Sequence, residues 1–198
     1  YLTVINHKGS VGMSLLLVGI LLWTLVHFIP VFASKFRGKI TEKIGLGPYK
    51  GLLALSLIGA IALMVIGWRA YPEIYYYPQA EGMREVSFIL VFVGIILFVA
   101  SGVKTNLKRY LRHPQLTGVM IWAFAHLLSN GEARAVILFS GFFIWALVMK
   151  MGINKRDGVW EKPQAVSVML DIKVLIAAVP LYALLTYLHQ YFTGIALV

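Results

Sequence analysis

The chain alternates long apolar runs with short polar connections. A run of about 20 apolar residues is long enough to cross a hydrocarbon core about 30 Å thick. Six such runs stand at residues 13–34, 50–69, 86–103, 115–130, 134–151 and 171–192. The pattern therefore predicts an all-α fold, a polytopic membrane helix bundle of about six transmembrane helices.

Two connections in this pattern differ from the others, one by being very short and one by being rich in Pro and Tyr. The fourth run is short, and the turn Ser129-Asn130-Gly131 joins it tightly to the fifth, so we expect these two runs to form a helical hairpin. The third run follows the Pro- and Tyr-rich stretch YPEIYYYPQAEGMRE. Its tyrosines are expected at the membrane interface as an aromatic belt.

The basic residues give the predicted bundle an orientation. The connections 35–50, 104–112 and 150–173 hold most of the 18 Lys and Arg. They are alternate connections, so a six-span chain places all three on one side, and the positive-inside rule makes that side cytoplasmic. Both termini then face outward.

Composition supports a membrane protein and limits its partners. Hydrophobic residues make up 60% of the 198 residues and charged residues only 13%, which is far from the balance of a globular domain. The net charge of +10, concentrated in short connections, suits a lipid bilayer with an anionic leaflet rather than nucleic acid. Cysteine is absent, which excludes disulfides, thiolate ligands and a cysteine nucleophile.

The first residues differ from the rest of the chain. Met13 opens MSLLLVGILLW, which resembles a native start, so residues 1–12 are expected to be a non-native or unstructured segment. Residues 13–198 are expected to form a single transmembrane domain. The first span is too long for a cleaved signal peptide and is kept as a true span.

Histidines are the chemically informative residues inside the spans. His27 and His126 lie within the first and fourth spans, where ionisable residues are costly and usually functional. His113 lies at the cytoplasmic mouth of the fourth span and His189 near the outer end of the sixth. His113 and His126 are separated by about 20 Å along one helix, so they cannot share one metal ion.

Two neutral imidazoles from different helices, in a bundle rich in Phe and Trp, suit the iron of a haem. His27 and His126 are therefore the predicted metal ligands, with His113 as a weaker cofactor-binding candidate. Trp122 and Phe124 are candidates for walls of the cofactor site, although packing is the default role of such residues. A membrane histidine that only bonds a neighbouring carbonyl is the alternative for each ring.

The first-span histidine in HFIPVFASKFRGKITEKIGLGPYKGLLAL, together with RHPQLTGVMIWAFAHLLSNG, resembles the NnrU family of bacterial membrane proteins over about Met13 to Trp145. Zeta-carotene isomerase of plants belongs to the same superfamily. The resemblance implies haem b with two axial histidines, matched here by His27 and by His126 in Trp-x-x-x-His. It also implies the bacterial inner membrane. The isomerase-like pattern often has Cys where Ala123 stands, which puts any role of that thiol in doubt.

The resemblance leaves several functions open. One is cis-trans isomerisation of an apolar polyene, and another is a haem protein linked to nitric oxide and denitrification, so enzymatic activity is undecided. A membrane methyltransferase using S-adenosylmethionine is an alternative, because Arg-His-Pro also opens the isoprenylcysteine methyltransferase signature. Asp157 and Glu161 match the acidic part of that signature poorly. A non-enzymatic assembly factor or subunit of a respiratory complex is a further alternative.

Overall fold

A computed structural model describes residues 2–197, with side chains from Gly9 onward. These residues form seven α-helices and one short 3-10 helix, η1, which confirms the all-α prediction. The elements are α1 (Leu2–Phe32), α2 (Ser34–Ile44), α3 (Leu46–Ala70), α4 (Met83–Ser101), η1 (Asn106–Arg109), α5 (Pro114–Ser129), α6 (Ala133–Asp157) and α7 (Val168–Thr193). They form two compact units, Tyr1–Ile74 and Tyr75–Val198.

Among the described residues, five helices are long and apolar enough to cross a membrane, against about six expected. Four of them are α3, α4, α6 and α7, and the fifth is the part of α1 from Gly9 to Phe32. The predicted fourth span corresponds to α5, which has 16 residues and a length of about 24 Å. It is shorter than a hydrocarbon core of about 30 Å, yet it packs between α4 and α6. It therefore completes the helix bundle without matching its neighbours in length.

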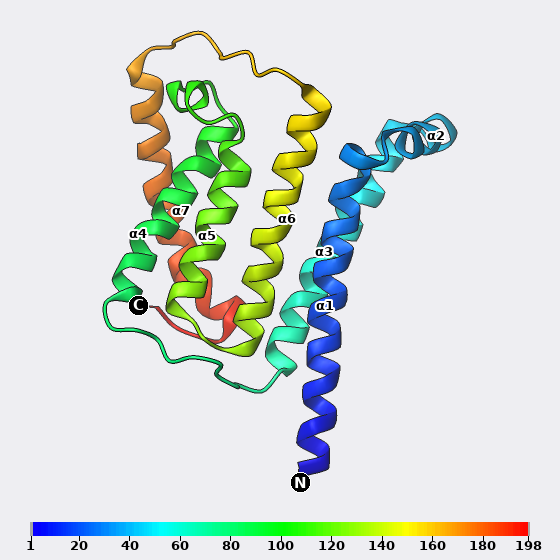
Figure 1. Cartoon of the computed structure of the whole chain (residues 1–198), viewed down its shortest axis with the longest axis vertical. Coiled ribbons are helices and arrows are strands. Elements are labelled where there is room, and N and C mark those ends of the chain that lie inside the picture. Colours follow the sequence, from blue (N-terminus) through cyan, green and yellow to red (C-terminus); the bar gives the residue numbers. More distant parts are fainter. Residues whose placement is uncertain (1, 198) are drawn as a thin grey trace. The chain divides into compact units, whose positions relative to one another are not determined.

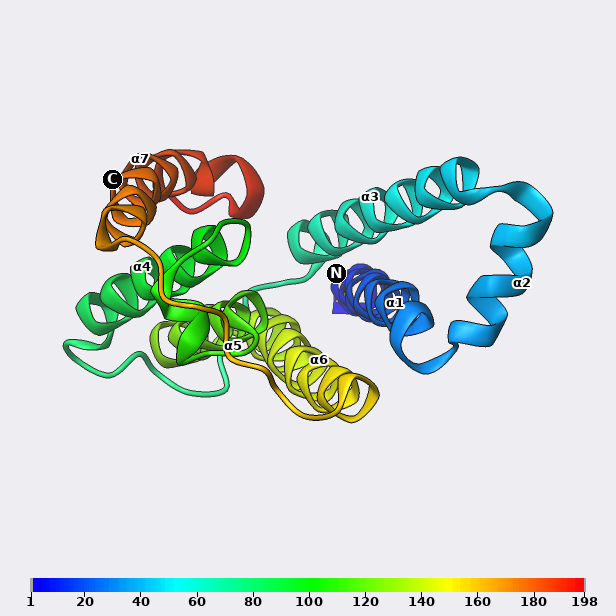
Figure 2. The ribbon, with the colours of Figure 1, turned by 90° about the horizontal axis from the view of Figure 1, so that it is seen from above.

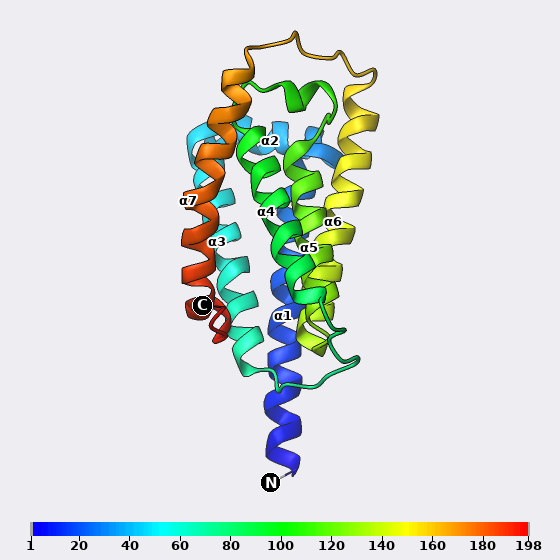
Figure 3. The same ribbon diagram turned by 90° about the vertical axis from the view of Figure 1, so that its left-hand side faces the viewer.

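The first unit is a hairpin of α1 and α3, which lie side by side and antiparallel (Figures 1 and 3). Leu16, Ala60 and Met64 form its buried centre. A Cβ on Gly67 would lie 2.5 Å from the backbone nitrogen of Leu16. Glycine at this position therefore allows the two backbones to pack closely.

The N-terminal segment is helical from Leu2 onward, because α1 continues upstream of Met13. Whether that segment is native stays a prediction.

The basic connection 35–50 was expected to be a loop, but most of it is helix α2. Phe36, Ile40 and Ile44 recur every four residues, as do Lys35, Lys39 and Lys43. An apolar and a basic stripe on one helix are typical of a helix that lies in the membrane interface. None of its residues is buried.

In the second unit the helices form one row in the order α7, α4, α5, α6 (Figure 2). The closest approach in the row is between α4 and α5, where Gly94 faces Gly118. A Cβ on Gly118 would lie 2.6 Å from the carbonyl oxygen of Gly94. This small-residue contact brings α5 against α4 along its length.

The two basic connections of the second unit lie at the same end of it. Arg112 donates to the carbonyl of Gly158 over 2.7 Å, and the side-chain amide of Asn106 donates to the carbonyl of Val166 over 2.9 Å. Asp171, at the start of α7, accepts from the backbone N–H of Asn106 over 2.8 Å. The α5–α6 turn and the end of α7 lie at the opposite end (Figures 1 and 3).

Candidate functional site

His126 lies on α5, three residues before the end of that helix, and is partly buried. Its Nδ1 is 2.8 Å from the carbonyl oxygen of Trp122, one turn earlier. Its ring stacks on Phe139 of α6, with ring centroids 4.2 Å apart and an interplanar angle of 24°. A hydrogen bond and an aromatic face therefore hold the imidazole in one orientation.

The bond to Trp122 also decides which ring nitrogen carries the proton. A carbonyl oxygen only accepts, so Nδ1 must donate, and the lone pair of the neutral ring lies on Nε2. Metal-binding histidines commonly donate their other ring N–H to a backbone carbonyl in this way. The ring of His126 is thus in the tautomer that an iron ligand requires.

His27, in the first unit, repeats the local arrangement of His126. Its Nδ1 is 2.9 Å from the carbonyl oxygen of Trp23, and its ring lies 4.4 Å from the Trp23 ring, centroid to centroid. Both histidines thus end the motif Trp-x-x-x-His within a helix, and in both the lone pair is on Nε2. Sequence reasoning noticed this motif only at His126.

The structure gives His113 a structural contact. It is the N-cap residue of α5, and Pro114 begins the helix. Its Nε2 lies 2.8 Å from the side-chain oxygen of Asn154, near the end of α6, so that nitrogen donates rather than offering a lone pair. Together with the bond from Arg112 to Gly158, this contact ties the start of α5 to the end of α6.

The two predicted aromatic walls behave differently. Trp122 packs against the His126 ring at 5.0 Å and, edge to face, against the Phe139 ring at 5.0 Å. Phe124 is 47% exposed, and on an α-helix it lies about 200° around the axis from His126. The structure therefore brings Trp122 to the His126 ring but not Phe124.

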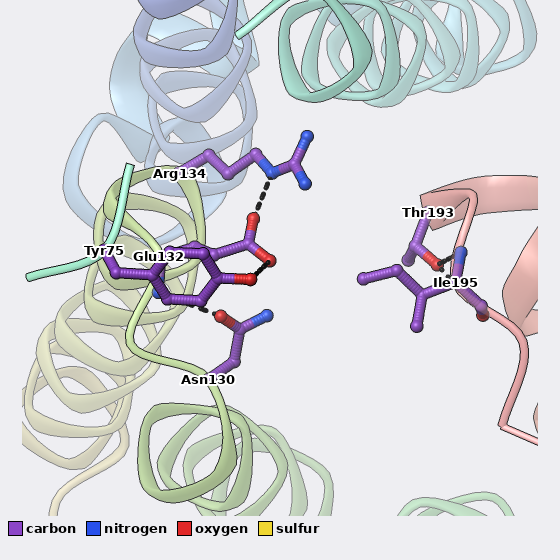
Figure 4. Close-up of polar contacts among 6 residues, drawn as sticks. All are labelled: Tyr75, Asn130, Glu132, Arg134, Thr193 and Ile195. Atoms are coloured by element: carbon purple, nitrogen blue, oxygen red, sulfur yellow. Dashed lines mark hydrogen bonds and ion pairs between the residues drawn. The ribbon is translucent and has the colours of Figure 1, made fainter. Parts of the chain in front are cut away.

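A buried ion pair at the start of α6 was missed by sequence reasoning, which placed no charge clearly inside a span. Glu132 and Arg134 are only 3% and 5% exposed, and Nε of Arg134 lies 2.5 Å from Oε2 of Glu132. Figure 4 shows the Glu132 carboxylate between Arg134 and Tyr75, whose hydroxyl donates to Oε1 over 3.3 Å. The signal was available in the sequence as Gly-Glu-Ala-Arg between two apolar runs.

The tyrosine-rich connection between α3 and α4 is hydrogen-bonded to the turn between α5 and α6. Tyr76 donates its backbone N–H to the carbonyl of Gly131 over 2.8 Å. The hydroxyl of Tyr77 donates to the carbonyls of Leu127 and Asn130. Partial burial raises the pKa of the Tyr77 phenol, so this donor stays protonated well above neutral pH. We call residues 71–82 the strap.

Comparison with known families identifies the family of this chain. The family model described as NnrU protein matches residues 15–197, nearly the whole chain. The chain belongs to the NnrU family. No curated protein matches this member of the family, and no solved structure does.

One observation tests whether the residues of this NnrU protein are suited to bind haem, namely the protonation of the two imidazoles. Two imidazoles hold their Nδ1 protons on backbone carbonyls and so keep Nε2 as the donor nitrogen. Haem iron takes axial imidazole nitrogen, and the surrounding Trp and Phe side chains suit an apolar macrocycle. The donors and their surroundings are therefore of the right chemical type.

Proposed function

We propose that this NnrU protein is an integral membrane protein that binds haem b, and that His126 and His27 are the residues that would hold its iron. The observation that carries the proposal is the Trp-x-x-x-His arrangement, which occurs twice and in both places leaves the lone pair on Nε2. Two independent histidines in one tautomer, both inside apolar helices, are better explained by a common ligand than by packing alone.

The residues around each imidazole have distinct tasks in this proposal. The carbonyls of Trp23 and Trp122 accept hydrogen bonds from Nδ1–H. These bonds raise the basicity of Nε2, the nitrogen that would bind the iron. The Phe139 ring holds the plane of the His126 imidazole by stacking. The bundle around His126 limits access of water to the imidazole.

Haem, when bound, supplies an iron centre that polarises a double bond or takes up a small gas. Two reactions of that kind match the family: cis-trans isomerisation of an apolar polyene and a response to nitric oxide in denitrification. Further parts of the proposal are the bacterial inner membrane as location, basic connections on the cytoplasmic side and outward-facing termini.

The test is the absorption spectrum of the protein purified from haem-replete cells. The wild-type protein is expected to show a Soret band and one haem b by the pyridine haemochrome assay. His126→Ala removes the nitrogen donor that Trp122 and Phe139 position, so haem content is expected to fall at least about tenfold.

His113→Ala is the matched control, because the Nε2 of His113 is engaged with Asn154. This variant is expected to retain its haem. Colourless wild-type protein from haem-replete cells would overturn the proposal, and so would full haem content in His126→Ala.

A further inference from the structure

Helix α2 lies crosswise at one end of the hairpin formed by α1 and α3 (Figures 1 and 3). Ala33 alone separates it from α1, and Gly45 alone separates it from α3. Gly45 has φ 83° and ψ 161°, a backbone conformation that is essentially restricted to glycine. Because α1 and α3 are each long enough to cross a membrane, α2 lies at the membrane surface, where these two helices end.

One face of α2 is apolar and exposed. At about 100° per residue, Phe36, Ile40 and Ile44 lie within a stripe about 80° wide. Phe36 is 55% exposed and Ile44 is 40% exposed. The described residues therefore leave this apolar stripe uncovered. The acyl chains of one lipid leaflet are what a helix at this depth meets, and they would cover the stripe.

Three lysines lie along one edge of the apolar stripe. Lys35, Lys39 and Lys43 follow one another at four-residue spacing, and all three are exposed. None of them forms an ion pair among the described residues, and neither does Glu42, the only acidic residue of α2. Like charges at this spacing repel one another, so an anion between the lysines would stabilise the helix.

Arg37 lies on the opposite edge of the stripe and connects α2 to the hairpin. Its guanidinium carbon lies 5.9 Å from the ring centroid of Tyr49, which is 5% exposed near the start of α3. A guanidinium at this distance from an aromatic face is attracted to it. This contact and the turn at Gly45 hold α2 in one orientation, with its apolar stripe and its lysines side by side.

We propose that α2 is a binding surface for acidic phospholipids. The phosphates of the headgroups lie between the three lysines, and the acyl chains cover the apolar stripe. Lysine beside an apolar stripe suits this ligand, because its aliphatic stem lies along the acyl chains while the ammonium reaches the headgroups. Acidic lipid is favoured over zwitterionic lipid, since α2 has four basic residues and one acidic residue. The inference is independent of haem, because neither His27 nor His126 lies on α2.

The test measures lipid binding to the whole protein in detergent by native mass spectrometry. Phosphatidylglycerol and phosphatidylcholine with identical acyl chains are the two probes, and the wild-type protein is expected to bind phosphatidylglycerol more tightly. Lys35→Gln/Lys39→Gln/Lys43→Gln is expected to weaken phosphatidylglycerol binding at least about tenfold, because each lysine adds to the attraction of an anionic headgroup. Binding of phosphatidylcholine should stay unchanged in this variant.

Lys104→Gln/Lys155→Gln/Lys162→Gln is the matched control, because it removes the same charge from exposed positions outside α2. This control should keep most of the preference for phosphatidylglycerol. Equal weakening by the two triple variants would overturn the inference, and so would no weakening by the α2 variant. Equal affinity of the wild-type protein for the two lipids would overturn it as well.

A second measurement separates lipid from a protein partner as the occupant of the apolar stripe. The chain has no cysteine, so Ile44→Cys and Glu42→Cys each give a single site for a spin label, on faces of α2 about 200° apart. In nanodiscs of phosphatidylglycerol, the label at residue 44 should collide with oxygen, which concentrates among acyl chains. The label at residue 42 should collide with a water-soluble nickel chelate. A label at residue 44 that meets the nickel chelate, or that is shielded from both reagents, would contradict a lipid-covered stripe.

Discussion

Single residues decide how polar groups are tolerated among the apolar helices of this protein. His27 and His126 each place the Nδ1 proton on the carbonyl one turn earlier, so Nδ1 is satisfied within the histidine's own helix. Glu132 and Arg134 satisfy each other at almost complete burial. The free energy of such a pair depends on both members, because each alone would be a buried charge without compensation.

We therefore expect Glu132→Gln to destabilise the protein by roughly 3–5 kcal/mol, because the buried Arg134 charge would lose the carboxylate with which it forms an ion pair. Thermal or denaturant unfolding in detergent micelles measures this loss. The control is Asp157→Asn in the Arg156–Asp157 pair, whose side chains are 44% and 40% exposed. Water compensates exposed charges, so the control should lose far less stability, and equal losses in the two variants would contradict the assignment.

Among the elements, the strap and the α5–α6 turn are joined directly by hydrogen bonds. Two hydrogen bonds hold the strap against the turn. The backbone N–H of Tyr76 donates to the carbonyl of Gly131, and the hydroxyl of Tyr77 donates to the carbonyl of Asn130. Gly131 has no space for a side chain, since a Cβ there would lie 1.9 Å from the carbonyl oxygen of Tyr77. The strap therefore stays in place only while residue 131 is glycine.

Gly131→Ala is expected to release the strap, because the added methyl group overlaps the backbone of Tyr77. Digestion with a protease that cleaves after glutamate should then cut faster at Glu73 and Glu81. Gly59→Ala is the control, because a Cβ on Gly59 meets nothing within 4 Å. An unchanged cleavage rate in Gly131→Ala would show that the strap does not depend on this close contact.

For the whole molecule, the arrangement of the second unit bears on its orientation in the membrane. The connections that follow α4 and α6 meet at one end, where Arg112 bonds to Gly158. The strap and the α5–α6 turn lie at the other end. From the positive-inside rule we therefore predict that the first end is cytoplasmic and the strap external.

The natural absence of cysteine makes this orientation simple to test with single cysteines. Gln79→Cys in the strap should react with a membrane-impermeant maleimide added to intact spheroplasts. Lys162→Cys, between α6 and α7, should react only after the membrane is permeabilised, and the cysteine-free chain is the blank. The opposite labelling pattern would invert the predicted topology.

The sequence alone was sufficient for the helical class, for five of the six expected spans and for the family. Hydrophobic length and charge asymmetry report directly on how a helix partitions into a bilayer, which is a local property of each segment. The placement of His27 and His126 inside apolar helices, and of His113 next to the start of the fourth span, was also predicted from the sequence. An imidazole in an apolar run and a proline after histidine are visible without knowing the packing.

Only the tertiary structure decided the features that depend on which segments meet. The burial of Glu132 with Arg134, the attachment of the strap and the direction of Phe124 away from His126 arise from helix packing. Contacts between residues distant in the chain are set by packing and hydrogen-bond geometry, whereas hydropathy reports only where each residue partitions.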